Sequence, residues 1–252
     1  MSELRLNKVL ARSGVCSRRK ADQLIQSGRV TLNEQVVRKP GIKVDPEKDR
    51  LQVNGRAIRL DLLDNRELVY VMLNKPVQVV TTMHDPQGRP KVADLLPENL
   101  KKLRLFPVGR LDYFSQGLLI LTNDGDLAHR LTHPSTNISK VYLVEVRGSL
   151  TRNKIRLMRR GMVLKEGERL APVKVEVIKS LNDHASLQMT LTQGLNRQIR
   201  RMCRDLDLTV LTLIRIRQGP VSLEGLKPGQ WRMLKSSETG ALRKSAGLEP
   251  AG

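Results

Sequence analysis

Apolar residues in the first sixty positions recur first at helical spacing and then at strand spacing. Two apolar triplets each share one helical face, namely Leu6, Val9 and Leu10, and then Ala21, Leu24 and Ile25. Ser17 is a predicted N-cap for the second helix. Short β-like pieces follow, and Asn-Gly at 54–55 between two apolar pairs is typical of a β-hairpin. Residues 1–60 are therefore predicted to form a small unit of two helices followed by strands.

Beyond a polar stretch at 61–67, which is predicted to be a linker, strand-like runs outnumber helical ones. The predicted strands are 69–73, 79–82, 118–121, 142–146, 173–178 and 186–191, and the predicted helices are 127–131, 154–160 and 197–206. Hairpin-length gaps between several strands favour an α+β domain, residues 68–239, on a largely antiparallel sheet. From residue 240 the chain is rich in small and charged residues, so 240–252 is predicted to be a disordered tail.

Charge narrows the choice of partners. The 252 residues carry 45 Lys and Arg against 25 Asp and Glu, a net charge of +20. An excess of this size favours a polyanionic partner, and nucleic acid is the first candidate. A membrane partner is disfavoured, because no basic amphipathic helix has an aromatic-rich apolar face. The N-terminus has no apolar run typical of a signal peptide, and no stretch is long enough to cross a bilayer, so a cytoplasmic protein is expected.

No cofactor or metal is expected. The chain contains neither GxGxxG nor GxxxxGK[ST], which removes support for a nucleotide cofactor or an NTPase. Cys16 and Cys203 lie far apart without a CxxC pairing. The four histidines, at 84, 129, 133 and 184, form no metal-ligand constellation.

Basic residues cluster on and around the second predicted helix, and they could simply form a solvated face. The string RLNKVLARSGVCSRRKADQLIQSGRVTLNEQVV, however, resembles the alpha-L RNA-binding motif over about residues 3–50. That resemblance implies that the two helices present their basic residues to the RNA backbone. The predicted RNA-binding residues of this unit are Arg12, Arg18, Arg19, Lys20 and Arg29.

One acidic residue stands out in the string VGRLDYFSQGLLILTNDG at 108–125. An Asp after Gly-Arg-Leu is by itself more often a turn or cap residue than a catalyst. The whole string resembles the signature of the RsuA/RluB/RluE/RluF group of pseudouridine synthases, in which Gly-Arg-Leu-Asp carries the catalytic carboxylate. The resemblance implies that Asp112 is the catalytic carboxylate and that Arg110 fills the gap left by a flipped base.

Further strings extend the resemblance over nearly the whole chain. Lys140-Val-Tyr142 is similar to the family's Lys-x-Tyr motif, whose tyrosine stacks on the target uracil and accepts a proton, although a Tyr opening a strand is usually packing. In GLNRQIRRMC the resemblance implies that Arg200 pairs with Asp112 and holds it ionised. The other arginines, with Arg197 and Arg201 as candidates, are expected to meet solvent or RNA phosphate, and Lys140 is also a predicted RNA-binding residue. The string LNKP at 73–76 matches a motif that packs behind the site.

The resemblance implies an rRNA pseudouridine synthase, a monomer without cofactor, with Asp112, Tyr142 and Arg200 as catalytic residues. The strings at 196–201 and 213–232 are more similar to members that act on 23S rRNA than on 16S rRNA. The alternatives are a small-subunit enzyme and a non-catalytic RNA-binding assembly factor. A carboxylate suits attack or proton transfer near the sugar and uracil, but the sequence leaves open whether it attacks the ring or removes a ribose proton. It also leaves open which uridine is modified.

Overall fold

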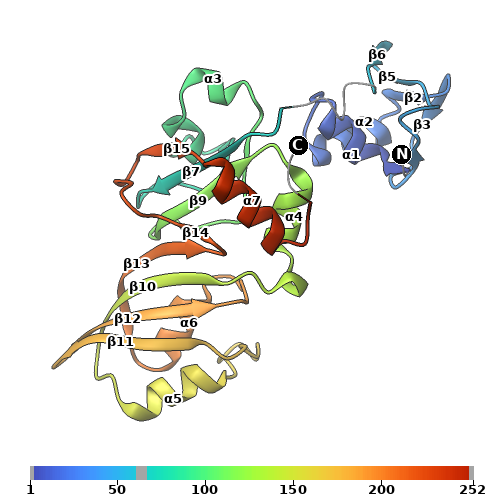
Figure 1. Ribbon diagram of the computed structural model, residues 1–252. Helices are drawn as coiled ribbons and strands as arrows, with labels where there is room; N and C mark the ends of the chain where they lie inside the picture. Colours follow the sequence, from blue (N-terminus) through green and yellow to red (C-terminus); the bar gives the residue numbers. More distant parts are fainter. Residues whose placement is uncertain (1–2, 61–66, 250–252) are drawn as a thin grey trace. The chain divides into compact units, whose positions relative to one another are not determined.

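The computed structural model describes residues 3–60 and 67–249. The chain divides into two units, Met1–Glu67 and Leu68–Gly252 (Figure 1). Most of the predicted linker, 61–66, lies outside the described residues. Each unit has its own sheet and its own apolar core.

The first unit begins with strand β1 (Leu4–Arg5) and helices α1 (Leu6–Arg12) and α2 (Arg18–Gln26). The Ser17 hydroxyl accepts a hydrogen bond from the Lys20 backbone nitrogen at 3.3 Å, which confirms the predicted N-cap. Both apolar triplets are buried and pack into one core with residues of the following strands. Arg18, Arg19 and Lys20 occupy the first turn of α2 and are exposed.

Four short strands of this unit form one sheet in the order β3-β2-β5-β6, with all neighbours antiparallel. They span Val30–Leu32 (β2), Gln35–Val37 (β3), Leu51–Val53 (β5) and Arg56–Ile58 (β6), while β4 (Lys43–Val44) pairs with β1. Asn54 and Gly55 both have positive φ, +50° and +76°, so the predicted Asn-Gly hairpin is confirmed.

The second unit is built on a sheet whose main path runs β11-β12-β10-β13-β9-β7-β15. Its strands are β7 (Tyr70–Lys75), β9 (Gln116–Thr122), β10 (Lys140–Arg147), β11 (Lys174–Leu181), β12 (His184–Leu191), β13 (Thr209–Gln218) and β15 (Trp231–Met233), with β8 (Phe106–Pro107) and β14 (Val221–Ser222) at its sides. Neighbouring strands in the described part of this sheet are antiparallel except β9 and β13, which are parallel. This confirms the α+β class on a largely antiparallel sheet.

Helices cover the two halves of this sheet differently. Over β11-β12-β10-β13, α5 (Arg152–Arg160) and α6 (Gln198–Asp205) pack on one face, with Met158, Met202 and Cys203 in a shared core. Over β9 and β7, α4 (Gly125–Thr132) and α7 (Ser236–Ser245) pack on one face, and a segment containing α3 (Glu98–Lys101) packs on the other. The two halves thus have separate apolar cores.

The halves meet where β9 and β13 pair in parallel, through Gln116 with Ile214 and Gly117 with Arg215. Gly117 has φ +113°, and a Cβ there would lie 2.3 Å from the Arg215 carbonyl oxygen. A glycine is therefore required for the backbones to come this close. We call this pairing the seam.

Two expectations from the sequence are wrong. The tail predicted as disordered from residue 240 contains most of α7, because Leu242, fully buried, packs into the core over β9 and β7. The run at 79–82 is not a strand: Val80 makes only an isolated bridge to Lys91. No helix among the described residues has the length and apolar character needed to cross a bilayer.

Candidate active site

The loop between β8 and β9 carries Asp112. The Thr81 hydroxyl donates to the Leu111 carbonyl oxygen at 2.7 Å and accepts from the Leu111 nitrogen at 3.2 Å. The Ser115 nitrogen donates to the Asp112 carbonyl oxygen at 3.0 Å, which closes a turn after the carboxylate. These bonds fix the loop on both sides of Asp112.

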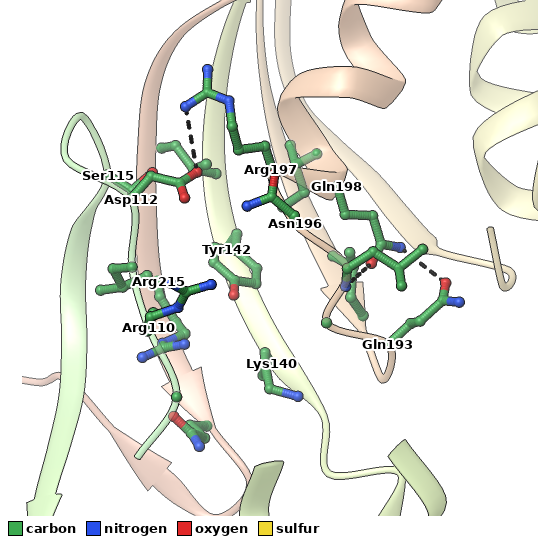
Figure 2. Close-up of a pocket in the computed structure, with 18 of the residues that line it drawn as sticks. Arg110, Asp112, Ser115, Lys140, Tyr142, Gln193, Asn196, Arg197, Gln198 and Arg215 are labelled. Carbon is green, nitrogen blue, oxygen red and sulfur yellow. Dashed lines mark hydrogen bonds and ion pairs between the residues drawn. The ribbon is translucent and has the colours of Figure 1, made fainter. Parts of the chain in front are cut away.

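Beside this loop lies a pocket of about 300 Å³, roughly the lower limit for small-molecule sites (Figure 2). It brings together five of the predicted site residues: Arg110, Asp112, Lys140, Tyr142 and Arg197. Two others, Arg200 and Arg201, are not among the described residues that line it. The sequence strings at 108–112, 140–142 and 194–199 therefore meet at one place although they are far apart in the chain.

The arginine that pairs with Asp112 is Arg197. Its Nη1 lies 3.8 Å from Asp112 Oδ2, as Figure 2 shows. Arg197 precedes α6 in the left-handed region, with φ +49°, so it stands outside the helical repeat of the arginines that follow.

Arg200 instead donates from Nη2 to the Phe114 carbonyl oxygen at 2.8 Å. The predicted ion pair of Arg200 with Asp112 is therefore wrong in this structure. The guanidinium nonetheless supports the loop two residues after Asp112. Burial lowers the pKa of Arg200, and neighbouring Arg197 lowers it further, while Asp112 acts in the opposite direction.

A buried lysine lies behind the loop that carries Asp112. Lys75 is fully buried, and its ammonium donates to the Pro76 and Ser115 carbonyl oxygens at 2.7 and 2.8 Å. Burial lowers its pKa to about 8, and the charge of Asp112 partly offsets that effect. The string LNKP indicates only packing behind the site; the structure adds a cation that ties β7 to the loop.

Tyr142 and Lys140 project from β10 into the pocket, because alternate residues of a strand share a face (Figure 2). Tyr142 is half-buried and packs against both the core under α6 and the core under α3. Burial lowers the pKa of Lys140, and Arg215 on the neighbouring strand lowers it further. Arg215 is itself buried and donates from Nε to the Leu118 carbonyl oxygen at 2.7 Å. Nothing in the sequence pattern singles out Arg215 as a pocket residue.

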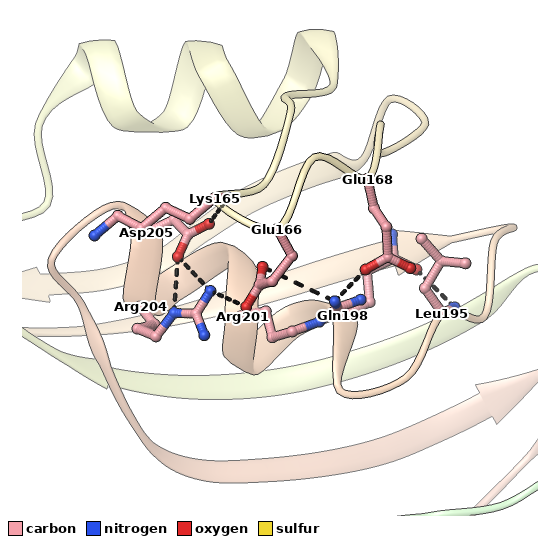
Figure 3. Close-up of polar contacts among 8 residues, drawn as sticks. All are labelled: Lys165, Glu166, Glu168, Leu195, Gln198, Arg201, Arg204 and Asp205. Carbon is pink, nitrogen blue, oxygen red and sulfur yellow. Dashed lines mark hydrogen bonds and ion pairs between the residues drawn. The ribbon is translucent and has the colours of Figure 1, made fainter.

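Arg201 and Arg204 on α6 are held by carboxylates of the segment that follows α5 (Figure 3). Arg201 donates to Glu168, and Arg204 donates to Glu166 at 2.7 Å. The Arg201 side chain is only 16% exposed. The prediction that Arg201 contacts RNA does not fit this arrangement, since its charge is neutralised within the protein.

Replacing Arg201 by glutamine is therefore expected to reduce stability rather than RNA binding. Loss of its charge-assisted hydrogen bond should lower the free energy of unfolding by about 1–2 kcal/mol, measured by urea denaturation. Glu168→Gln and the double variant complete a double-mutant cycle, and the pair should show coupling. A change in the salt dependence of RNA binding without a loss of stability would contradict this role.

The donor set of the site does not indicate a metal centre. Among the described residues, no three His, Cys, Asp or Glu side chains lie close enough together to hold a metal ion. The pocket instead combines one carboxylate, one phenol and several cations around a space of about 300 Å³. Such a set can hold an anionic polymer and move protons or make a covalent bond through Asp112.

Each of the two units matches a known protein family. Residues 4–51 match the S4 domain family, and residues 69–205 match the RNA pseudouridylate synthase family. The chain belongs to the RNA pseudouridylate synthase family. It is an enzyme that isomerises uridine in RNA.

Individual relatives match over the full chain. A "Ribosomal large subunit pseudouridine synthase B" of Bacillus subtilis (strain 168) is 38% identical over 96% of this chain and 96% of its own length. An "Uncharacterized RNA pseudouridine synthase" of Aquifex aeolicus (strain VF5) is 38% identical over 99% and 97%. A crystal structure of a pseudouridylate synthase superposes with a TM-score of 0.68 at 30% identity, covering 95% of this chain and 99% of that one.

Proposed function

We propose that this enzyme converts a uridine of 23S ribosomal RNA to pseudouridine, with Asp112 as the catalytic carboxylate. The observation that carries the proposal is the full-length match to relatives named as large-subunit synthases. Besides the Bacillus relative, one from Salmonella typhi with that name is 38% identical over 99% of this chain and 85% of its own length. The loop and pocket around Asp112 supply a site for the chemistry.

The reaction needs only the groups that the pocket contains. The N-glycosidic bond of uridine breaks, the uracil turns, and its carbon five joins carbon one of the same ribose; carbon five then loses its proton, and the freed ring nitrogen N1 gains one. Product and substrate are isomers, so no oxidant, reductant or co-reactant enters. Asp112 faces the pocket beside the Tyr142 ring, on which a flipped uracil can stack.

The cations around Asp112 have separate roles in this proposal. Arg197, at 3.8 Å, balances the charge of the carboxylate, while Arg200 and Lys75 hold the backbone of its loop through the Phe114 and Ser115 carbonyl oxygens. Arg200 is then a positioning residue rather than the direct partner of the carboxylate. Arg110, exposed and two residues before Asp112, remains the candidate to fill the gap left by the flipped base.

The first unit is proposed to hold the RNA backbone. Three exposed cations occupy the first turn of α2, which has no acidic residue there. The positive end of a helix dipole disfavours cations by some tenths of a kcal/mol each, so an incoming phosphate relieves that repulsion. Arg29 is also exposed, and Arg12 ends α1. Binding to ribosomal RNA as a monomer, in the cytoplasm, completes the proposal.

The test is to map pseudouridines in both ribosomal RNAs by carbodiimide-block primer extension in a strain lacking this protein. One stop in 23S rRNA should disappear, return with the wild-type chain, and stay absent with Asp112→Asn. A missing stop in 16S rRNA instead would identify a small-subunit enzyme. Unchanged stops in both RNAs would overturn the assignment to ribosomal RNA.

A further inference from the structure

Helix α5 is strongly basic and unlike its neighbour α6 in how its charge is used. Five of its nine residues, RNKIRLMRR, are Lys or Arg, and none is acidic. On α6, Arg201 and Arg204 are neutralised by Glu168 and Glu166. Among the described residues, no carboxylate forms an ion pair with α5.

Three arginines form one exposed stripe along α5. Arg152, Arg156 and Arg160 are spaced i, i+4, i+8, which places them along one face over about 12 Å of helix axis. Within the described part of the chain, none of the three forms an ion pair with a carboxylate; Arg156 donates to the Asn153 side-chain oxygen at 2.6 Å. Their charges are therefore left to solvent or to a ligand.

The other residues of the helix explain its fold without this stripe. Met158 is fully buried and Ile155 packs against the same core, which anchors α5 to the sheet. Arg159 lies beside the stripe, but its guanidinium donates to the Val175 carbonyl oxygen of β11 at 2.7 Å. The Thr151 hydroxyl accepts from the Lys154 nitrogen and caps the helix. Folding thus accounts for the buried side and the cap, not for the exposed arginines.

The stripe lies on the same side of the sheet as the catalytic pocket. Tyr142, which lines the pocket, and Val144 of β10 both contact the core that α5 covers. In the strand order β11-β12-β10, the edge strand under α5 is two strands from β10, or about 10 Å. Figure 1 shows α5 alongside β11 at this end of the second unit. A nucleic acid that enters the pocket can therefore continue onto α5 without crossing the sheet.

We propose that Arg152, Arg156 and Arg160 bind the phosphate backbone of the RNA molecule whose uridine occupies the pocket. This inference rests on the proposed function for the identity of the RNA. Residues four apart are about 6 Å apart along the helix axis, which suits successive phosphates of one strand. Arginine holds phosphate through bidentate hydrogen bonds, so a row of three gives a defined track rather than a diffuse charge. Binding of this kind carries no base specificity.

The test compares two triple variants of the full chain by RNA affinity at several salt concentrations. The first is Arg152→Gln/Arg156→Gln/Arg160→Gln, in which glutamine keeps the helix propensity. The matched control, Lys101→Gln/Lys102→Gln/Arg104→Gln, removes three exposed charges in and after α3. The probe is a 23S rRNA fragment containing the mapped uridine, with turnover measured at saturating RNA.

In the α5 variant, the slope of log affinity against log salt should become shallower by about 0.7–0.9 for each phosphate that the protein no longer neutralises, or by about 2.1–2.7 for the three arginines together. Turnover at saturation should be unchanged. The control should keep the wild-type slope. Equal changes of slope in both variants would show that only the net charge of the protein matters. An unchanged slope in the α5 variant would show that the stripe does not bind RNA and would favour an acidic protein as its partner. Either result overturns the proposal.

A second measurement needs no variant. RNA bound to the wild-type protein should protect Arg152, Arg156 and Arg160 from phenylglyoxal, read by mass spectrometry, and leave Arg104 reactive. Equal reactivity with and without RNA would overturn the inference. Failure of the proposed function can be distinguished from failure of this inference. If the proposed function is wrong, the wild-type protein forms no pseudouridine in the rRNA fragment, whether or not the α5 arginines bind RNA.

Discussion

Replacing Asp112 by asparagine is expected to abolish pseudouridine formation while leaving RNA affinity nearly unchanged. The substitution preserves the size of the side chain, and the loop remains held by Thr81 and Ser115. It removes the only acidic group among the described residues that line the pocket. Turnover should fall roughly 10³-fold or more, since general acid–base function alone contributes about 10²–10⁴-fold.

Tritium released from carbon five of labelled uridine in an rRNA fragment measures this turnover directly. The control is Asp126→Asn, an acid substitution near the start of α4 that lies outside the pocket. It should retain wild-type turnover. Turnover of the Asp112 variant within about tenfold of wild type would contradict the catalytic role.

The second large effect is expected at Gly117, where the two halves of the sheet meet. In Gly117→Ala the new methyl would lie 2.3 Å from the Arg215 carbonyl oxygen and 2.6 Å from its nitrogen. Backbone atoms cannot move aside as a flexible side chain does, and φ +113° is itself unfavourable for alanine. The free energy of unfolding should fall by about 3 kcal/mol or more, and activity should fall with it because the seam borders the pocket.

Gly125→Ala is the matched control. Gly125 begins α4, and among the described residues no atom outside the adjoining residues and the nearby backbone of α4 lies within 4 Å of the position that a Cβ would take. Alanine is favoured over glycine in helices by up to about 1 kcal/mol, so this variant should be as stable as wild type or slightly more stable. Urea unfolding followed by circular dichroism compares both. Equal unfolding midpoints for Gly117→Ala and wild type would show that the seam tolerates a side chain.

Much of the local structure could be predicted because local chemistry specifies it. Ser17 is a good helix cap in any context, and Asn54-Gly55 suits the positive φ angles of a tight hairpin. The second unit depends more on distant packing. Strand β13, central in the sheet, is missing from the predicted strands, and the polar window of α7 predicts disorder; only the burial of Leu242 reveals how that helix packs.

The sequence motifs that contribute to the candidate site could be predicted, but the side chains that lie next to one another in it could not. The resemblance implies roles for Asp112 and Tyr142, and the structure places both in one pocket. It also implies a role for Arg200, whereas Arg197 is the residue beside Asp112. The difference arises from a positive φ at Arg197, and an arginine gives no sequence signal for that conformation.

The seam affects when the pocket can form during synthesis of the protein. Its partners, Gln116 with Ile214 and Gly117 with Arg215, are about a hundred residues apart, so the pairing is among the least local in the fold. The loop that carries Asp112 precedes β9, whereas Arg197 and β13 come late in the chain. During synthesis, a nascent protein that has exposed Asp112 still lacks the other wall of its pocket. We therefore expect no chemistry on uridine until β13 has left the ribosome and paired with β9.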